Sequence, residues 1–276
     1  MRKLLVFSII AFLVCFASHL AHAATLVGYW PFEETSGSTV NDQSGFNNDG
    51  QLTGASRSTG KIGSGLSFNG TGGVTIPNSP SLDSLPGGFT MEAWINQTNF
   101  TDYQTIFWKT DRHDRVDMLH FQVGDNTNLP ASEGRLYACL NGPPAADGPC
   151  DFEMIASRTV DLNEWHFVAW TYDESAGVLY DNGIPVLSLP FSDPWEGNDL
   201  DLLIGQHQEL AFANFVGMID EARIYHGALT QEEIIRDMNA VIPEPSTAVL
   251  LSAGLLGLAL RKRKRFRSPS ASSSLS

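Results

Sequence analysis

The chain has 276 residues and a formal net charge of −14 at pH 7. Between Ala24 and Ile242 it holds 9 of its 17 Lys and Arg residues and 30 of its 31 Asp and Glu residues, so this part carries a charge of −21. Such a surface repels phosphate backbones, and we therefore expect no binding to nucleic acid. About 220 residues remain for folding, which is enough for one large domain.

The N-terminus predicts a secretory signal peptide. Arg2 and Lys3 form a positive region, Leu4–Phe16 forms an apolar region, and Ala21-His22-Ala23 has the small-residue pattern of a cleavage site. We assign residues 1–23 to this leader and expect the mature chain to begin at Ala24.

Residues 24–239 are predicted to form one all-β domain. Short stretches in which apolar residues alternate are separated by clusters of Gly, Asn, Asp and Pro, which favours a sandwich, jelly roll or barrel. The predicted strands are 25–32, 65–68, 73–76, 89–96, 105–109, 118–123, 135–139, 165–172, 177–180, 185–189, 200–204 and 222–225. One helix is predicted at the end, where Thr230 precedes residues 231–238 and Glu233 stands at the capping-box position.

Period-two geometry assigns faces within these strands. In the stretch 89–95 the apolar face consists of Phe89, Met91, Ala93 and Ile95. Trp94, on the opposite face, is predicted to pack under a loop. His166 lies in a strand that is apolar on both faces, and we interpret it as a hydrogen-bonded structural histidine.

Two cysteines, Cys139 and Cys150, remain outside the leader and flank a stretch rich in turn formers. In an oxidising compartment a close pair of this kind most often forms a disulfide. A metal or redox pair is the weaker alternative, because no C-x-x-C spacing is present.

Six segments stand out when they are taken in order: residues 28–34, 42–50, 65–70, 89–95, 164–169 and 215–225. Together they resemble the landmarks of the bacterial laminin G-like, concanavalin A-like jelly-roll domain. The resemblance spans Leu26 to Met238. It implies an antiparallel β-sandwich jelly roll, frequently with calcium, that serves carbohydrate or protein recognition.

The same resemblance implies a structural Ca²⁺ site formed by Asp42, Asn48, Asp220 and Glu221. The segment 42–50 concentrates oxygen ligands and glycines, as a Ca²⁺ loop requires. The alternative for this segment is a hydrated Asx-rich turn, in which Asp and Asn bond to their own backbone.

No catalytic motif is found in the sequence, so we expect no enzyme activity. The concanavalin A-like fold also hosts glycoside hydrolases, but their Glu-x-Asp-x-x-Glu strand is missing. Asp199 and Asp201 share a face and lack a third partner. For ligand binding, the loop tryptophans Trp195 and Trp108 are candidate stacking platforms, although each could instead cap the core edge.

The C-terminus predicts a sorting signal, which we assign to residues 240–276. Pro243-Glu244-Pro245 is followed by an apolar run of about 14 residues, shorter than the roughly 20 of a stable span, and by a basic cluster that includes Arg261 and Arg263. This order resembles the PEP-CTERM signal of Gram-negative bacteria, although here a Ser-rich tail follows. It implies transient membrane anchoring, processing by an exosortase-type membrane protease and delivery to the cell surface or extracellular matrix.

Taken together, the sequence predicts an exported, non-catalytic module for carbohydrate recognition or adhesion, with a polysaccharide or glycoprotein as partner. The alternatives are a structural matrix protein without a specific ligand and a divergent glycoside hydrolase.

Overall fold

A computed structural model of the chain describes residues 24–100, 103–110, 119–124, 134–140, 152–192, 195, 197–208 and 210–240. The predicted signal peptide and residues 241–276 lie outside the described residues, so both boundaries stay predictions. By its internal contacts the chain divides into residues 1–235 and 236–276, and the architecture below is that of the first unit. Within the described ranges, no helix combines the length and apolar character needed to cross a bilayer.

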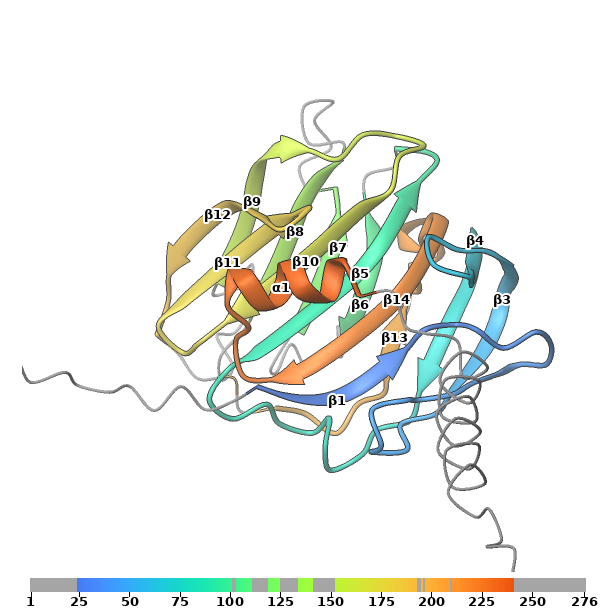
Figure 1. Cartoon of the computed structure of the whole chain (residues 1–276), viewed down its shortest axis with the longest axis horizontal. Helices are drawn as coiled ribbons and strands as arrows, with labels where there is room; N and C mark the ends of the chain where they lie inside the picture. The colour runs from blue at the N-terminus through green and yellow to red at the C-terminus, as the bar shows by residue number, and fades with distance from the viewer. Residues whose placement is uncertain are drawn as a thin grey trace, which may run out of the picture. The chain divides into compact units, whose positions relative to one another are not determined.

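The fold consists of short antiparallel strands joined by turns and loops (Figure 1). The strands are β1 (Thr25–Trp30), β2 (Thr39–Val40), β3 (Gly50–Thr59), β4 (Ser64–Ile76), β5 (Phe89–Gln97), β6 (Gln104–Lys109), β7 (Leu119–Val123), β8 (Arg135–Leu140), β9 (Phe152–Thr159), β10 (His166–Tyr172), β11 (Ala176–Asp181), β12 (Ile184–Pro190), β13 (Leu202–Ile204) and β14 (Val216–His226). A 3-10 turn, η1 (Ala211–Ala213), precedes β14, and the helix α1 (Gln231–Met238) follows it.

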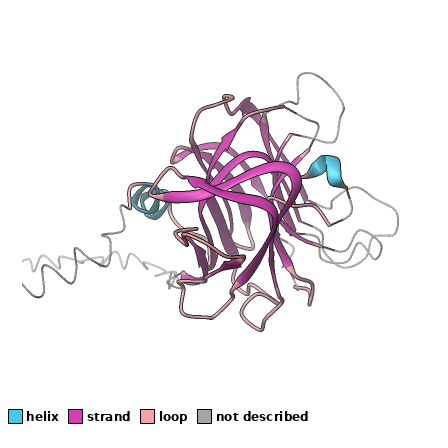
Figure 2. Cartoon of the chain, turned by 90° about the vertical axis from the view of Figure 1, so that its right-hand side faces the viewer, coloured by secondary structure: helices cyan, strands magenta, loops and turns pink. Residues whose placement is uncertain are grey.

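The strands form one hydrogen-bonded path that curves around a shared core. Its order is β12-β11-β10-β5-β14-β4-β13-β6-β7-β8-β9, with β1 added on β14 and β2 and β3 added beside β4. Figure 2 shows the strands arranged around the interior. This is the sandwich, close to a barrel, that the strand pattern predicted.

The core is built by alternation along each strand, as β5 illustrates. Phe89, Met91, Ala93 and Ile95 are fully buried in the hydrophobic core, which confirms the predicted face. Phe89 makes an edge-on contact with Trp170 of the neighbouring β10, with ring centroids 4.7 Å apart. The opposite face of β5 carries Trp94, over which the Lys61 ammonium lies 4.5 Å from the ring centroid.

The helix begins with the predicted capping box. The Thr230 backbone N–H donates to Glu233 Oε2 over 2.9 Å, and the Glu233 N–H donates back to the Thr230 hydroxyl over 3.3 Å. Ile234 is fully buried, and the Gln231 side chain donates to the Gly183 carbonyl in the turn between β11 and β12. The N-terminal half of α1 is therefore fixed both by its cap and by packing.

The two ends of the strand path, β12 and β9, lie next to each other without a ladder between them. Phe152 of β9 stacks on Phe191, which follows β12, with ring centroids 4.2 Å apart and an angle of 4° between the planes. Pro185 and Pro190 lie in β12. Each proline removes a backbone donor, so this edge is poorly suited to pairing with another strand.

Three strands were missed by the sequence pattern: β2, which has only two residues, β3 and β9. β3 is largely exposed and polar, and β9 alternates only over its first half, so neither has a clear apolar period. In addition, the two segments predicted at 65–68 and 73–76 are parts of one long strand, β4, whose polar middle had been read as a turn.

Candidate functional site

A row of stacked rings crosses the strands β6, β7 and β8. Trp108 stacks on His120, with ring centroids 5.0 Å apart and 10° between the planes. His120 stacks in turn on Tyr137, at 5.4 Å and 12°. At the other end, His207 contacts Trp108, with centroids 3.8 Å apart. We call these four side chains the aromatic row.

Alternation and strand register place the aromatic row on the sheet face that points away from the core. Leu119, Phe121 and Val123 of β7 are core residues, so His120 between them points to the opposite side. Trp108 is the direct cross-strand partner of His120 and must share its face. The aromatic row is therefore separate from the hydrophobic core, although its members are buried.

Two polar atoms on this face lack hydrogen-bond partners. His120 is 6% exposed and its Nδ1 has none, and the same holds for the hydroxyl of the fully buried Thr105, which lies opposite Gln122. Burial, together with the nearby His207, lowers the pKa of His120 from 6.5 to about 3, so its imidazole is neutral. Buried polar atoms are nearly always paired, and such exceptions point to a missing partner.

A pocket of about 330 Å³ lies beside the aromatic row. Its lining residues are Asp199, Leu200, Asp201, Leu203, Gln206 and Gln208. Leu203 of β13 is the cross-strand partner of Trp108, which places the pocket and the row on the same face. The Gln206 Oε1 is buried and has no hydrogen-bond partner. The pocket thus presents carboxylates, amides and leucines, and the buried Trp108 lies next to it.

Lys109 lies behind the pocket wall. Its ammonium donates to Asn78 Oδ1 over 2.7 Å and to the Leu200 carbonyl, and the side chain is 2% exposed. Burial lowers the Lys109 pKa from 10.5 to about 8, although Asp83, Asp201 and Asp199 act in the opposite direction. The lysine ties two loops to the end of β6 and so shapes the pocket.

The two tryptophans predicted as ligand platforms occupy different places. Trp108 is a member of the aromatic row, 5% exposed, and its indole N–H donates to the Thr110 carbonyl over 3.0 Å. Trp195 is part of the hydrophobic core and contacts Phe89 edge-on, with centroids 6.4 Å apart. The position of Trp195 favours the alternative weighed for it, a tryptophan that caps the core edge.

Asp42, the first of the predicted Ca²⁺ ligands, organises a turn. Its carboxylate accepts hydrogen bonds from the backbone N–H groups of Tyr29, Ser44 and Asn48 over 2.8–2.9 Å, and from the Ser44 hydroxyl over 2.7 Å. Asn48 is buried, and its Oδ1 accepts from the Ser79 hydroxyl over 2.6 Å. These contacts match the alternative of an Asx-rich turn.

Asp220 and Glu221, the other predicted ligands, lie at a bulge of β14 opposite β5. Glu221 has a φ of 54°, a conformation that bulky residues rarely adopt, so regular alternation does not apply there. Asp220 is fully buried and accepts hydrogen bonds from the backbone N–H groups of Ile62 and Glu221. Burial raises the Asp220 pKa from 3.8 to about 7.

Glu221 belongs to a buried polar network with Tyr29 and Arg223. The Tyr29 hydroxyl donates to Glu221 Oε2 over 2.8 Å, and the Arg223 guanidinium pairs with the same oxygen and with Glu92. Burial raises the pKa of Glu221 and also that of the Tyr29 phenol. In the described part of the chain, the carboxylates of Asp42, Asp220 and Glu221 do not form one group of metal-ligating atoms. Calcium binding by this set therefore stays a prediction.

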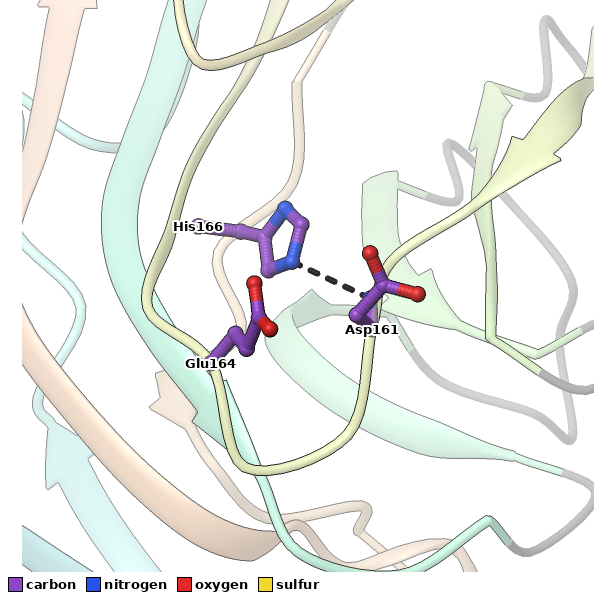
Figure 3. Close-up of side chains that lie close together, drawn as sticks. All are labelled: Asp161, Glu164 and His166. Atoms are coloured by element: carbon purple, nitrogen blue, oxygen red, sulfur yellow. Dashed lines mark hydrogen bonds between the residues drawn. The ribbon is translucent and has the colours of Figure 1, made fainter.

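Within the ranges that the structure describes, three metal-ligating side chains come together at Asp161, Glu164 and His166, whose ligating atoms lie within 4.8 Å of one another (Figure 3). The imidazole, however, is already engaged at both nitrogens. His166 Nε2 accepts the Asp161 backbone N–H over 3.0 Å, and Nδ1 lies 2.8 Å from Asp181 Oδ1. This geometry confirms His166 as a structural histidine, and the cluster does not suit a metal.

Sequence reasoning missed most of the aromatic row. His207 lies outside the predicted strands, so alternation does not place it; it is 7% exposed, and its Nδ1 accepts the Leu210 N–H over 3.0 Å. His120 and Tyr137 stand in predicted strands, where period two alone could have separated them from the core face. Cys139 is buried on β8, whereas Cys150 lies outside the described residues, so the disulfide stays a prediction.

The comparisons with known proteins identify two parts of the chain. Residues 68–235 match the family model described as the concanavalin A-like lectin/glucanases superfamily (Laminin_G_3). The chain belongs to this superfamily. The match begins at Phe68, after the first two landmarks of the laminin G-like domain. Residues 241–264 match the PEP-CTERM protein-sorting motif, which indicates export and sorting to the cell surface or beyond. Among curated proteins, no match was found.

Solved structures share the fold of this laminin G-like domain at low identity. Domain 4 of AbnA, a GH43 extracellular arabinanase from Geobacillus stearothermophilus solved in complex with arabinotriose, is 21% identical with a TM-score of 0.61, and the match covers 78% of this chain and 99% of that one. The binding domain of Paraclostridial Mosquitocidal Protein 1 is 18% identical with a TM-score of 0.60, covering 78% and 52%.

Trypanosoma rangeli sialidase is 16% identical with a TM-score of 0.56, and the match covers 78% of this chain and 32% of the sialidase. The laminin G-like chain thus spans about half of the second structure and about a third of the third. At these identities the three likenesses establish the fold alone.

Proposed function

We propose that the protein binds carbohydrate on the face of β13, β6, β7 and β8 that carries the aromatic row. The observation that carries this proposal is the pocket of about 330 Å³ beside Trp108. Sugars offer hydroxyl groups for hydrogen bonding and apolar ring faces for contact with aromatic rings. The carboxylates and amides that line the pocket suit the hydroxyl groups, and its two leucines, beside the buried aromatic row, suit the apolar ring faces.

The unpaired polar atoms support the same proposal. His120 Nδ1, the Thr105 hydroxyl and Gln206 Oε1 all lack partners in the protein and lie on or beside this face. Leaving such atoms unpaired costs about 1–3 kcal/mol each, and a hydroxyl-rich ligand or its bound water would recover part of that cost. The AbnA domain, solved with arabinotriose, is a structural relative consistent with this role.

A glycan array probed with the purified protein tests the proposal. We expect selective binding that is lost in a Gln206→Ala/Gln208→Ala variant, whose changed side chains line the pocket. Gln43→Ala is the matched control, because its exposed side chain lies in the loop after β2. Absence of binding to every glycan would favour the structural matrix protein. Hydrolysis of a bound glycan that disappears in Asp199→Asn would instead support the divergent glycoside hydrolase, since two carboxylates line the pocket.

For the C-terminus we propose transient anchoring and cleavage by an exosortase-type protease near Pro243-Glu244-Pro245, with release to the cell surface or matrix of a Gram-negative bacterium. The match of residues 241–264 to the sorting motif supports this proposal. Substituting Glu244→Ala should leave the full-length chain in the membrane fraction. Mass spectrometry of the exported protein would contradict the proposal if residues 261–276 were still attached.

A further inference from the structure

We propose that the pocket is charge-selective: it binds glycans that carry a free amino group most tightly and rejects glycans built from uronic acids. This inference rests on the proposed carbohydrate binding at the same pocket and adds the class of sugar. It follows from the charges of the lining residues, the position of Lys109 and the kind of hydrogen-bonding atom left without a partner.

Among the described residues that line the pocket, two carry negative charge and none carries positive charge. Asp199 and Asp201 are exposed at the pocket, and the other lining residues are two leucines and two glutamines. An incoming carboxylate would therefore meet two like charges with no guanidinium or ammonium among the lining residues to bind it. An ammonium group would meet two opposite charges.

Lys109 does not change the sign of the net charge at the pocket. Its ammonium is directed behind the wall, where it donates to Asn78 Oδ1 and to the backbone carbonyl of Leu200. This one ammonium interacts electrostatically with three carboxylates, those of Asp83, Asp201 and Asp199, so the local net charge stays negative. The lysine holds the pocket wall in place, and its ammonium binds protein groups rather than a ligand.

The two carboxylates and one amide oxygen at the pocket keep free acceptor positions, and the only donors among the described lining side chains are the glutamine amides. Asp201 Oδ1 accepts the Asn78 backbone N–H over 3.0 Å, which leaves Oδ2 for a ligand. Asp199 makes no hydrogen bond through its carboxylate in the described part of the chain, and Gln206 Oε1 is unpaired. A protonated amine brings three donors and no acceptor, whereas a uronate carboxylate brings acceptors only. The pocket therefore complements the amine in hydrogen bonding as well as in charge.

Three short oligosaccharides of equal length test the inference: one of glucosamine, one of N-acetylglucosamine and one of a uronic acid. Each is titrated calorimetrically into the purified protein in a mildly acidic buffer of low ionic strength, where the amine is protonated. We expect the glucosamine oligomer to bind about threefold to tenfold more tightly than its N-acetylated form, as two exposed ion pairs allow. No heat should be measured with the uronate. The preference should shrink as salt is added, because exposed charges are screened.

The variant Asp199→Asn/Asp201→Asn should bind the amine and the N-acetylated oligomer equally, while Glu164→Gln, an exposed acid of the loop before β10, should keep the wild-type preference. Uronate binding as tight as amine binding, or a preference unchanged in the double variant, would overturn the charge selectivity and leave carbohydrate binding standing. If none of the three oligomers binds but the array detects another glycan, the amine preference is overturned and the proposed function survives. If the array is empty too, both fail.

Discussion

Trp108 of β6 and His120 of β7 are cross-strand neighbours with stacked rings, whose centroids are 5.0 Å apart and whose planes differ by 10°. The pair lies on the side of the sheet opposite the hydrophobic core, between His207 and Tyr137. The stacked imidazoles and indole form a flat, buried layer beside the pocket that keeps hydrogen-bonding nitrogens, one of them unpaired, which is why we regard this face as functional.

Replacing His120 with Phe should separate binding from stability. The ring stack is kept, and the unpaired buried Nδ1 is removed, so the free energy of unfolding should be unchanged or higher by about 1 kcal/mol. Glycan affinity should fall, because the face loses a hydrogen-bonding atom. Thermal unfolding and glycan titration of the same preparations check both parts, and an unfolding midpoint well below the wild-type value would contradict the expectation.

The acid stability of the protein should depend on His120. Its pKa is about 3 in the folded protein and 6.5 when unfolded, so between these values only the unfolded chain takes up the proton. Stability should therefore fall as the pH drops from about 6.5, by at most about 5 kcal/mol. Denaturant unfolding at a series of pH values should show this loss in the wild type and not in His120→Phe. Parallel curves for the two proteins would rule it out.

Asp220 should give the opposite pH dependence of stability over an overlapping pH range. Its pKa is raised from 3.8 to about 7, so between these values only the folded chain keeps the proton. Stability should fall as the pH rises from about 4 to 7, by at most about 4 kcal/mol, and then level off. Denaturant unfolding of Asp220→Asn at the same pH values, in the presence of EDTA, should not show this loss of stability. Asp161→Asn, at an exposed acid, should titrate like the wild type.

Asp42→Ala should destabilise the fold even without metal. The carboxylate accepts three backbone N–H groups and one hydroxyl, and their loss should cost about 2–4 kcal/mol. Thermal unfolding with EDTA should show this lower midpoint. Repeating the measurement with Ca²⁺ tests the predicted metal site. A midpoint that rises with Ca²⁺ in the wild type and not in Asp42→Ala would establish the site, and no shift in either would remove it.

The predicted disulfide can be tested by mass spectrometry of the exported protein with and without reductant. In denatured protein, where burial no longer protects Cys139, we expect Cys139 and Cys150 to resist alkylation until reductant is added. Reduction should lower the free energy of unfolding by about 2–3 kcal/mol in the chain-entropy model for a loop of this size. Cys139→Ser should reproduce the loss, and alkylation of the native, unreduced protein at both cysteines would show that the bond does not form.

The sequence was a good guide wherever a strand has one apolar face. Phe89 to Ile95 of β5 alternate without exception, and the Thr230–Glu233 capping box is a purely local signal, so both were predictable. β3 was missed because a polar strand at the margin of a sheet has no period to detect.

The candidate site was harder to predict, because it depends on contacts between strands. That Trp108 stacks on His120 requires the β6–β7 register, and that Leu203 brings a pocket beside Trp108 requires the pairing of β13 with β6. The bulge at Glu221 likewise breaks the alternation on which a sequence argument relies. Family resemblance supplied the fold and left these long-range pairings open.

The contact between β12 and β9 affects how copies of this chain can associate. At high concentration, copies of a protein with an open sheet margin can add to one another as a growing fibre. Here the two margins shelter each other across the Phe152–Phe191 stack, and prolines interrupt one of them. Along β12 and β9 the backbone is therefore a poor template for a strand from another copy of the chain.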